Sequence, residues 1–131
     1  MKRVVVTAGA AGIGLRIAQT YLAAGAQVAI CDVDVGALDV FRAAHPDALA
    51  MQANVTDEAD MDAFFAACDE HLGSVDVMVS TAGIGGPAAL IEDLDYADWK
   101  ATLSTTLDGT FLSARWAAKH MRAQKSGLIV L

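Results

Sequence analysis

With 131 residues, of which 55% are hydrophobic and 19% charged, the chain has the composition of one globular domain with a sizeable core. Its formal net charge of −7 excludes the basic footprint that a nucleic-acid-binding protein needs. No apolar run reaches the roughly 18 residues of a membrane span, and the apolar start at Val4–Val6 is too short for a signal peptide. We therefore expect no nucleic-acid partner and no membrane partner.

The two cysteines, Cys31 and Cys68, form no CxxC pair, and each lies within an apolar pattern. We expect both to be small core residues with free thiols, as in a reducing compartment. The sequence thus predicts a cytoplasmic location, and its histidines and cysteines have no spacing typical of a metal site.

The first half of the chain alternates strands with helices. Apolar, β-branched runs and helical periodicity predict strands at residues 2–7, 27–32 and 48–54, and helices at residues 12–24 and 34–44. The first helix is expected to pack through periodic apolar residues, namely Ile13, Ile17, Ala18, Tyr21 and Leu22.

The second half continues the alternation. Thr56 is the predicted N-cap of a helix whose apolar residues recur at i, i+3, i+4, i+7 and i+11 from Met61. A strand at residues 75–80, a loop containing Gly83, a long helix at residues 95–124 and a strand at residues 128–131 complete the pattern.

Five strands joined by helices make repeated βαβ units, which favour right-handed crossovers and a parallel sheet. We predict an α/β fold: a Rossmann-type doubly wound parallel sheet with strand order 3-2-1-4-5. Residues 1–131 would form a single dinucleotide-binding domain that stops at its fifth strand.

A glycine-rich loop, Thr7-Ala8-Gly9-Ala10-Ala11-Gly12-Ile13-Gly14, joins the first strand to the first helix. Glycine lets the backbone approach a pyrophosphate closely, and a helix N-terminus offers free N–H groups to phosphates. The loop predicts cofactor contacts from Gly9, Gly12, Ile13 and Gly14. The alternative is a tight turn whose glycines serve packing alone.

Asp32 ends the second predicted strand, twenty residues after Gly12. A carboxylate there accepts hydrogen bonds from the ribose hydroxyls and repels a 2′-phosphate, which instead needs a nearby cation. Residues 8–11 and Val33 supply no lysine or arginine. The sequence therefore predicts NAD rather than NADP, with Asp32 and Val33 beside the ribose.

These motifs resemble the short-chain dehydrogenase/reductase family over essentially all 131 residues. The family's TGxxxGxG motif falls on residues 7–14, with Ala8 at the position of its first glycine. Asn54 and Val55 stand where the family commonly has Asp-Val. The resemblance implies that Asn54 accepts a hydrogen bond from the adenine amino group through its side-chain oxygen.

Two further segments carry the resemblance. Ser80-Thr81-Ala82-Gly83 stands in place of the family's Asn-Asn-Ala-Gly, which implies that Ala82 and Gly83 lie beside the cofactor. Thr106 stands at the asparagine of the pattern Asn-Leu-x-Gly-x-Phe, where the family's asparagine supports a proton-relay water. Thr106 is therefore a candidate for that role; the alternative is a mid-helix threonine that bonds the preceding turn.

The resemblance implies an NAD-dependent oxidoreductase that transfers hydride between the nicotinamide and an alcohol or carbonyl substrate. The family's catalytic serine follows the fifth strand, and a Tyr-x-x-x-Lys pair lies beyond it. The literal match at Tyr96 and Lys100 precedes that strand, so we expect both to be helix-surface residues. We assign no catalytic set within residues 1–131 and expect the chain alone to be inactive.

Two alternatives stay open at this point. One is a non-catalytic protein that binds NAD or a partner, because Ala8, Ser80, Thr81 and Thr106 depart from the family pattern. The other is a methyltransferase that binds S-adenosylmethionine, which also uses a glycine loop and an acid after the second strand. The resemblance further implies a homodimer or homotetramer that pairs through the helix at residues 95–124.

Overall fold

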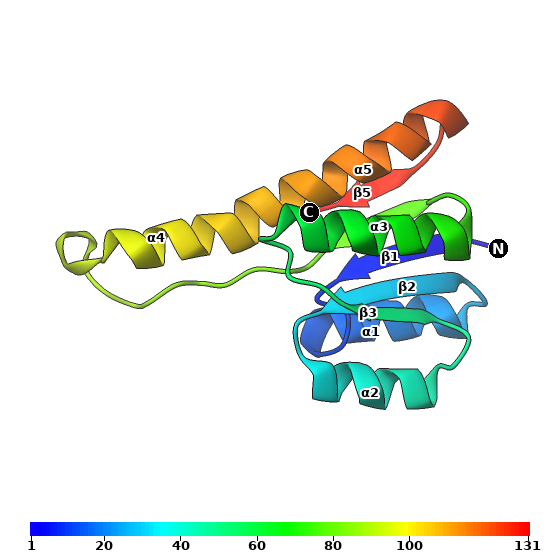
Figure 1. Ribbon diagram of the computed structural model, residues 1–131, viewed down its shortest axis with the longest axis horizontal. Helices are drawn as coiled ribbons and strands as arrows, with labels where there is room; N and C mark the ends of the chain where they lie inside the picture. Colours follow the sequence, from blue (N-terminus) through cyan, green and yellow to red (C-terminus); the bar gives the residue numbers. More distant parts are fainter.

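The computed structural model describes all of residues 1–131, and its centre is a five-stranded parallel sheet (Figure 1). The strand order is β3-β2-β1-β4-β5, so the predicted fold class and order are confirmed. The strands are β1 (Arg3–Thr7), β2 (Gln27–Asp32), β3 (Leu49–Gln52), β4 (Val77–Ser80) and β5 (Leu128–Val130).

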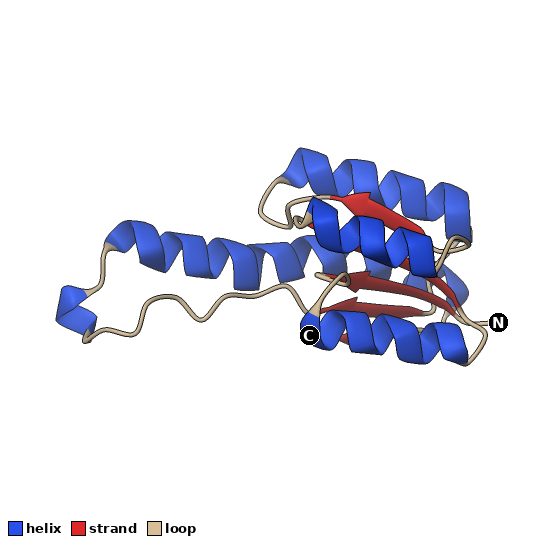
Figure 2. Cartoon of the chain, turned by 90° about the horizontal axis from the view of Figure 1, so that it is seen from below, coloured by secondary structure: helices blue, strands red, loops and turns tan.

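Helices cover both faces of the sheet (Figure 2). They are α1 (Gly12–Ala23), α2 (Val35–Ala44), α3 (Glu58–Leu72), α4 (Tyr96–Leu103) and α5 (Gly109–Gln124), with a short 3-10 turn η1 (Ile91–Asp93). The predicted long helix is one continuous path in which a π-helical turn, η2 (Ser104–Asp108), joins α4 to α5. None of these helices is long and apolar enough to cross a membrane.

The strands are apolar on both faces because each face is buried. On β1, Val4 and Val6 pack with α1 and α2, whereas Val5 packs with α3 and α5 on the opposite side. Cys31 and Cys68 are buried with free thiols, as predicted. The two cores hold the carboxyl ends of β1, β2, β3 and β4 together at one edge of the sheet.

Two local predictions are wrong. Ile13 was expected to pack on the sheet, but it is 76% exposed because it lies in the first turn of α1, beyond the carboxyl edge of β1. Thr56 was expected to cap α3, but Asp57 is the N-cap and accepts a hydrogen bond from the Asp60 N–H at 2.9 Å. The Thr56 hydroxyl instead donates to the side chain of Asn54.

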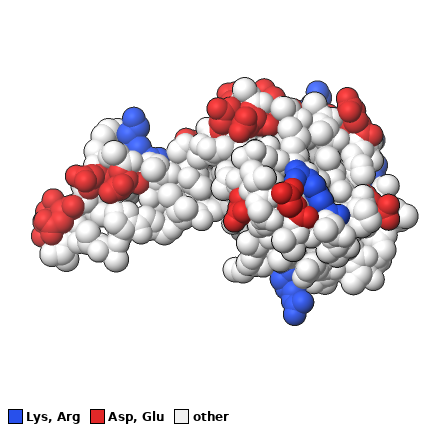
Figure 3. Space-filling model, turned by 60° about the horizontal axis from the view of Figure 1, so that its bottom comes forward, with Lys and Arg blue, Asp and Glu red and all other residues white.

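Residues 83–103, here called the arm, project away from the sheet with α4 (Figure 1). The acidic side chains of Glu92, Asp93, Asp95 and Asp98 belong to the tip of the arm, and a largely uncharged surface separates this tip from the body (Figure 3). The arm therefore presents apolar side chains to solvent, among them Ile91, Tyr96 and Trp99.

Candidate functional site

A cavity of about 350 Å³ opens at the carboxyl edge of the sheet, where ligands of doubly wound folds bind. It brings together residues at the carboxyl ends of four strands, β1, β2, β3 and β4. The predicted site residues in its lining are Asp32, Val33, Asn54, Val55, Ala82 and Gly83. The lining also contains residues that were not predicted, namely Ala8, Ala53, Ile84 and Thr105.

Asp32 is the single charged residue that lines this cavity. Its Oδ2 accepts a hydrogen bond from the Ala10 N–H, and its Oδ1 accepts one from the Asp34 N–H, both at 3.1 Å. A carboxylate has about four acceptor sites, so the two oxygens can still receive hydroxyl donors from a ligand. The two backbone bonds fix the carboxylate at the mouth of the glycine loop.

Helix α1 begins beside this carboxylate with no side-chain cap. Its N-cap residue is Ala11, whereas α2 and α3 are capped by the carboxylates of Asp34 and Asp57. The first N–H groups of α1 are therefore left for a ligand, and the helix dipole favours an anion there. Of the three helices that start at this edge, α1 alone is left without a side-chain acceptor at its N-terminus.

The glycines of the loop permit its close packing. A Cβ on Gly9 would lie 2.6 Å from Cγ2 of Ile30, and a Cβ on Gly14 would collide with the carbonyl oxygen of Ala8. Gly12 has a φ of +55°, which favours glycine. The predicted residues Gly9, Gly12, Ile13 and Gly14 lie at the start of α1 and not in the cavity lining. The predicted set therefore divides into a turn at the start of α1 and a cavity lining.

Asn54 lines the cavity, but its side-chain oxygen is engaged by donors of the chain itself. Oδ1 accepts hydrogen bonds from the Thr56 N–H at 3.0 Å and from the Thr56 hydroxyl at 2.8 Å. The expected acceptor for adenine is thus engaged in a local turn, because the following Thr56 supplies two donors.

A second loop closes the cavity from the β4 side. The Thr81 hydroxyl donates to the carbonyl oxygen of Thr7, and the Ala82 N–H donates to the Thr7 hydroxyl at 3.4 Å. Thr7 is fully buried and joins the ends of β1 and β4. Sequence reasoning missed it as a support of the site, although Thr7 opens the glycine motif and a buried hydroxyl requires a partner.

Thr106 lies in the π-helical turn, and its hydroxyl does not bond the preceding turn as the alternative interpretation predicted. Its hydroxyl lies 3.3 Å from the Ile84 nitrogen and 3.4 Å from the Ile84 oxygen, so it bridges to the arm instead of bonding the preceding turn. Its backbone carbonyl accepts a hydrogen bond from the Thr110 hydroxyl at 2.7 Å. The neighbouring Thr105, also within η2, lines the cavity.

The chain contains two kinds of side chain that can be reactive in enzymes, a tyrosine beside a lysine and a cysteine thiol. Tyr96 is 73% exposed on α4, with the Lys100 ammonium 5.5 Å from its ring centroid, so both are helix-surface residues as predicted. Burial raises the pKa of the Cys31 thiol to about 12, so that thiol stays protonated and non-nucleophilic near neutral pH.

Known proteins share this architecture. The short chain dehydrogenase family model matches residues 2–131. The chain is 41% identical over 129 residues to the cis-4-hydroxycyclohexanecarboxylate dehydrogenase of Sinomonas cyclohexanicum, covering 96% of this chain and 52% of that protein. It is 33% identical over 129 residues to the 2,3-dihydro-2,3-dihydroxybenzoate dehydrogenase of Bacillus subtilis (strain 168), covering 95% of this chain and 49% of that protein.

A solved structure agrees with the sequence comparison. The crystal structure of levodione reductase superposes with a TM-score of 0.91 at 34% identity, covering 98% of this chain and 52% of that one. The chain thus spans about half the length of the relatives it matches. These relatives are dehydrogenases and reductases by name, so the comparison does not favour the non-catalytic alternative. With its family match, strand order and glycine loop in agreement, the chain belongs to the short chain dehydrogenase family.

Proposed function

We propose that this chain binds NAD at the carboxyl edge of its sheet and forms the cofactor-binding part of a dehydrogenase. The observation that carries the proposal is the position of Asp32: a carboxylate fixed beside the uncapped start of α1 in a cavity lined by no lysine or arginine. That arrangement suits two ribose hydroxyls and disfavours a 2′-phosphate.

The other residues have complementary roles in this proposal. Gly9, Gly12, Ile13 and Gly14 would hold the pyrophosphate through backbone N–H groups and close approach. Ala82 and Gly83 have no bulky side chain, so they would leave room for the cofactor along the β4 side of the cavity. When bound, NAD supplies the hydride acceptor or donor for the chemistry.

The substrate we propose is a secondary alcohol, or the corresponding ketone, on a six-membered carbon ring. The support is the naming of two relatives as dehydrogenases of hydroxycyclohexanecarboxylate and of dihydrodihydroxybenzoate. The arm would border this substrate, because Ile84 already lines the cavity beside Gly83.

Two properties of the chain accompany this function. We propose that two copies pair through α4 and α5, where Leu103, Leu107 and Phe111 recur every four residues and remain exposed. We also propose a reducing, cytoplasmic location, supported by the two free buried thiols of Cys31 and Cys68.

Isothermal titration of the chain with NAD and with NADP tests the proposal. We expect NAD to bind at least tenfold more tightly, because the Asp32 carboxylate repels the 2′-phosphate. Asp32→Ser removes that charge and should bring the two dissociation constants within about threefold of each other. Asp34→Ser is the matched control, since Asp34 lies outside the cavity lining and Ser retains a cap for α2. Tighter binding of NADP to the unmodified chain would refute the proposal.

A further inference from the structure

We infer that the base-binding end of this site does not select the 6-amino group of adenine, because Asn54 offers a ligand its amide nitrogen instead of its oxygen. The inference rests on the proposed dinucleotide binding and concerns the same cavity. It departs from the expectation stated above, in which Asn54 accepts a hydrogen bond from adenine.

The orientation of the Asn54 amide follows from its neighbours. The atom near Thr56 receives the Thr56 backbone N–H at 3.0 Å, and a backbone N–H can only donate. That atom must therefore be the oxygen, which also accepts the Thr56 hydroxyl at 2.8 Å. Turning the amide over would place two N–H donors against each other.

The backbone of Asn54 is anchored as well. Its N–H donates to Asp60 Oδ2 at 3.0 Å, and its carbonyl oxygen accepts the Asp57 N–H at 3.0 Å. Asp57 and Asp60 belong to the start of α3, so the residue is anchored to a capped helix. Freeing Oδ1 for a ligand would break the two hydrogen bonds from Thr56.

The polar groups left for a base at this position are donors. Asn54 Nδ2 makes no hydrogen bond within the chain, and neither does the adjacent backbone N–H of Val55, although both residues line the cavity. The 6-amino group of adenine is itself a donor, whereas the 6-oxo group of hypoxanthine is an acceptor. Asn54 Nδ2 thus matches a 6-oxopurine and has no complement on the 6-amino group. The Val55 N–H, in contrast, matches the N1 acceptor of adenine and not the N1–H of hypoxanthine, so each base has one complementary donor here.

The ratio of two dissociation constants tests the inference. Nicotinamide hypoxanthine dinucleotide differs from NAD in the base alone, which carries a 6-oxo group in place of the 6-amino group and an N1–H in place of the N1 acceptor. Both dinucleotides are titrated calorimetrically into the full chain. We expect the two dissociation constants to lie within about threefold of each other, because each base finds one complementary donor. Preference for NAD by more than threefold would overturn the inference and leave the proposed NAD binding intact.

Asn54→Asp supplies a one-atom control. It replaces Nδ2 by an oxygen while Oδ1 keeps both bonds from Thr56, so the cavity gains an acceptor for the 6-amino group. The two ligands carry equal charge, so repulsion by the new carboxylate cancels in the ratio. We expect the ratio to move about fivefold toward NAD. A movement of less than threefold would contradict the inference, and failure of both ligands to bind the unmodified chain would overturn the proposed function along with it.

Discussion

Ala8 has a left-handed backbone conformation, with a φ of 50°, directly after β1. A Cβ in this region clashes with the neighbouring carbonyl and costs about 1–2 kcal/mol, which is why glycine is usual there. The site tolerates this strain because Thr81 and Ala82 hold the adjacent Thr7 from the β4 side. Ala8 is thus a strained residue that faces the cavity.

Ala8→Gly is expected to stabilise the chain by about 0.5–1 kcal/mol. Relief of the left-handed strain outweighs the greater entropy that glycine gives the unfolded chain. The midpoint of urea unfolding measures the change. Ala10→Gly is the control and should destabilise, because Ala10 has no positive φ. Equal destabilisation by both substitutions would contradict the strain that we assign to Ala8.

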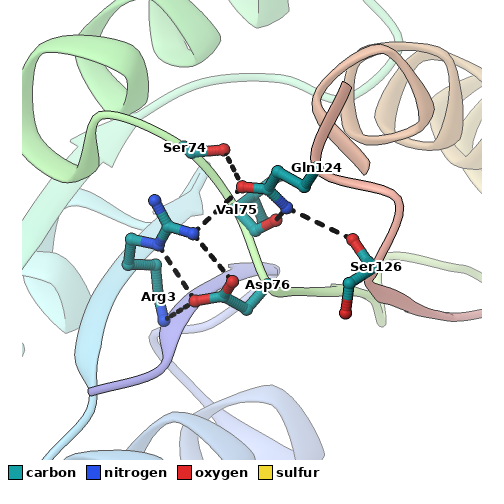
Figure 4. A network of polar contacts seen from close by, with 6 residues as sticks. All are labelled: Arg3, Ser74, Val75, Asp76, Gln124 and Ser126. Carbon is teal, nitrogen blue, oxygen red and sulfur yellow. Dashed lines mark hydrogen bonds and ion pairs between the residues drawn. The ribbon is translucent and has the colours of Figure 1, made fainter. Parts of the chain in front are cut away.

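At the scale of elements, a polar network ties β1, β4 and the end of α5 together at the edge opposite the cavity (Figure 4). Arg3 binds Asp76 through Nε and Nη2 at 2.9 and 2.8 Å, and its Nη2 also donates to Gln124 Oε1 at 3.0 Å. The amide nitrogen of Gln124 donates to the Val75 and Ser126 carbonyl oxygens. The network fixes where α5 ends relative to the sheet.

This network makes stability depend on pH. The hydrogen bond from Arg3 lowers the pKa of Asp76 from 3.8 to about 2. The folded chain thus binds that proton at lower pH than the unfolded chain, so the contribution is present above about pH 5 and is lost as the pH falls toward 2. Asp76→Asn should cost about 1–2 kcal/mol at pH 7 and flatten the stability profile between pH 5 and 2.

Urea unfolding at a series of pH values measures both effects. Asp39→Asn is the matched control, because the Asp39–Arg42 pair lies on the exposed face of α2 and such pairs contribute little. Equal losses from the two substitutions at pH 7 would refute the role of the Arg3–Asp76 pair.

Element order, strand order and most boundaries were predictable because they depend on local periodicity and on glycine positions. The caps and the π-helical turn were not predictable in this way. Asp57 and Thr56 are both favourable N-cap residues. Which of them caps α3 depends on Asn54, whose side-chain oxygen already accepts the N–H and the hydroxyl of Thr56. Within the turn η2, Thr106 contacts Ile84, which is 22 residues away in sequence, and no periodicity encodes such a contact.

Asp32 and the glycine loop could be located from sequence because the chemistry of the motif fixes both their spacing and their flanking elements. The supporting residues Thr7, Ile84 and Thr105 could not, since their roles arise from packing between the β4 loop and η2. The orientation of Asn54 likewise needs three-dimensional contacts, because the sequence alone does not reveal which of its amide atoms is engaged.

At the scale of the whole molecule, α5 buries one side and exposes another, whereas α4 has no buried residue. The buried side of α5 includes Leu112 and Ala117, whereas Leu107 and Phe111 are 60% and 59% exposed. Exposed apolar residues at four-residue spacing form a stripe on a helical surface, and such stripes mark association sites. The proposed pairing of two copies uses this stripe.

Phe111→Asp should therefore lower the solution mass from dimer to monomer, because it places a charge within the apolar contact. Light scattering after gel filtration measures the mass. Val40→Asp serves as the control, since Val40 is 72% exposed on α2 and lies outside the stripe. A monomeric unmodified chain, or a Phe111→Asp chain that stays dimeric, would contradict this pairing.

The central claim is that NAD lies along the carboxyl edge of the sheet. Backbone NMR of the ¹⁵N-labelled chain during titration with NAD tests it most directly. We predict that shifted amides cluster at residues 9–14, at Asp32–Val33, at Asn54–Val55 and at Ala82–Gly83, while the Arg3–Asp76 edge stays unchanged. Shifts confined to the arm or to the opposite edge of the sheet, or no shifts at saturating NAD, would contradict the claim.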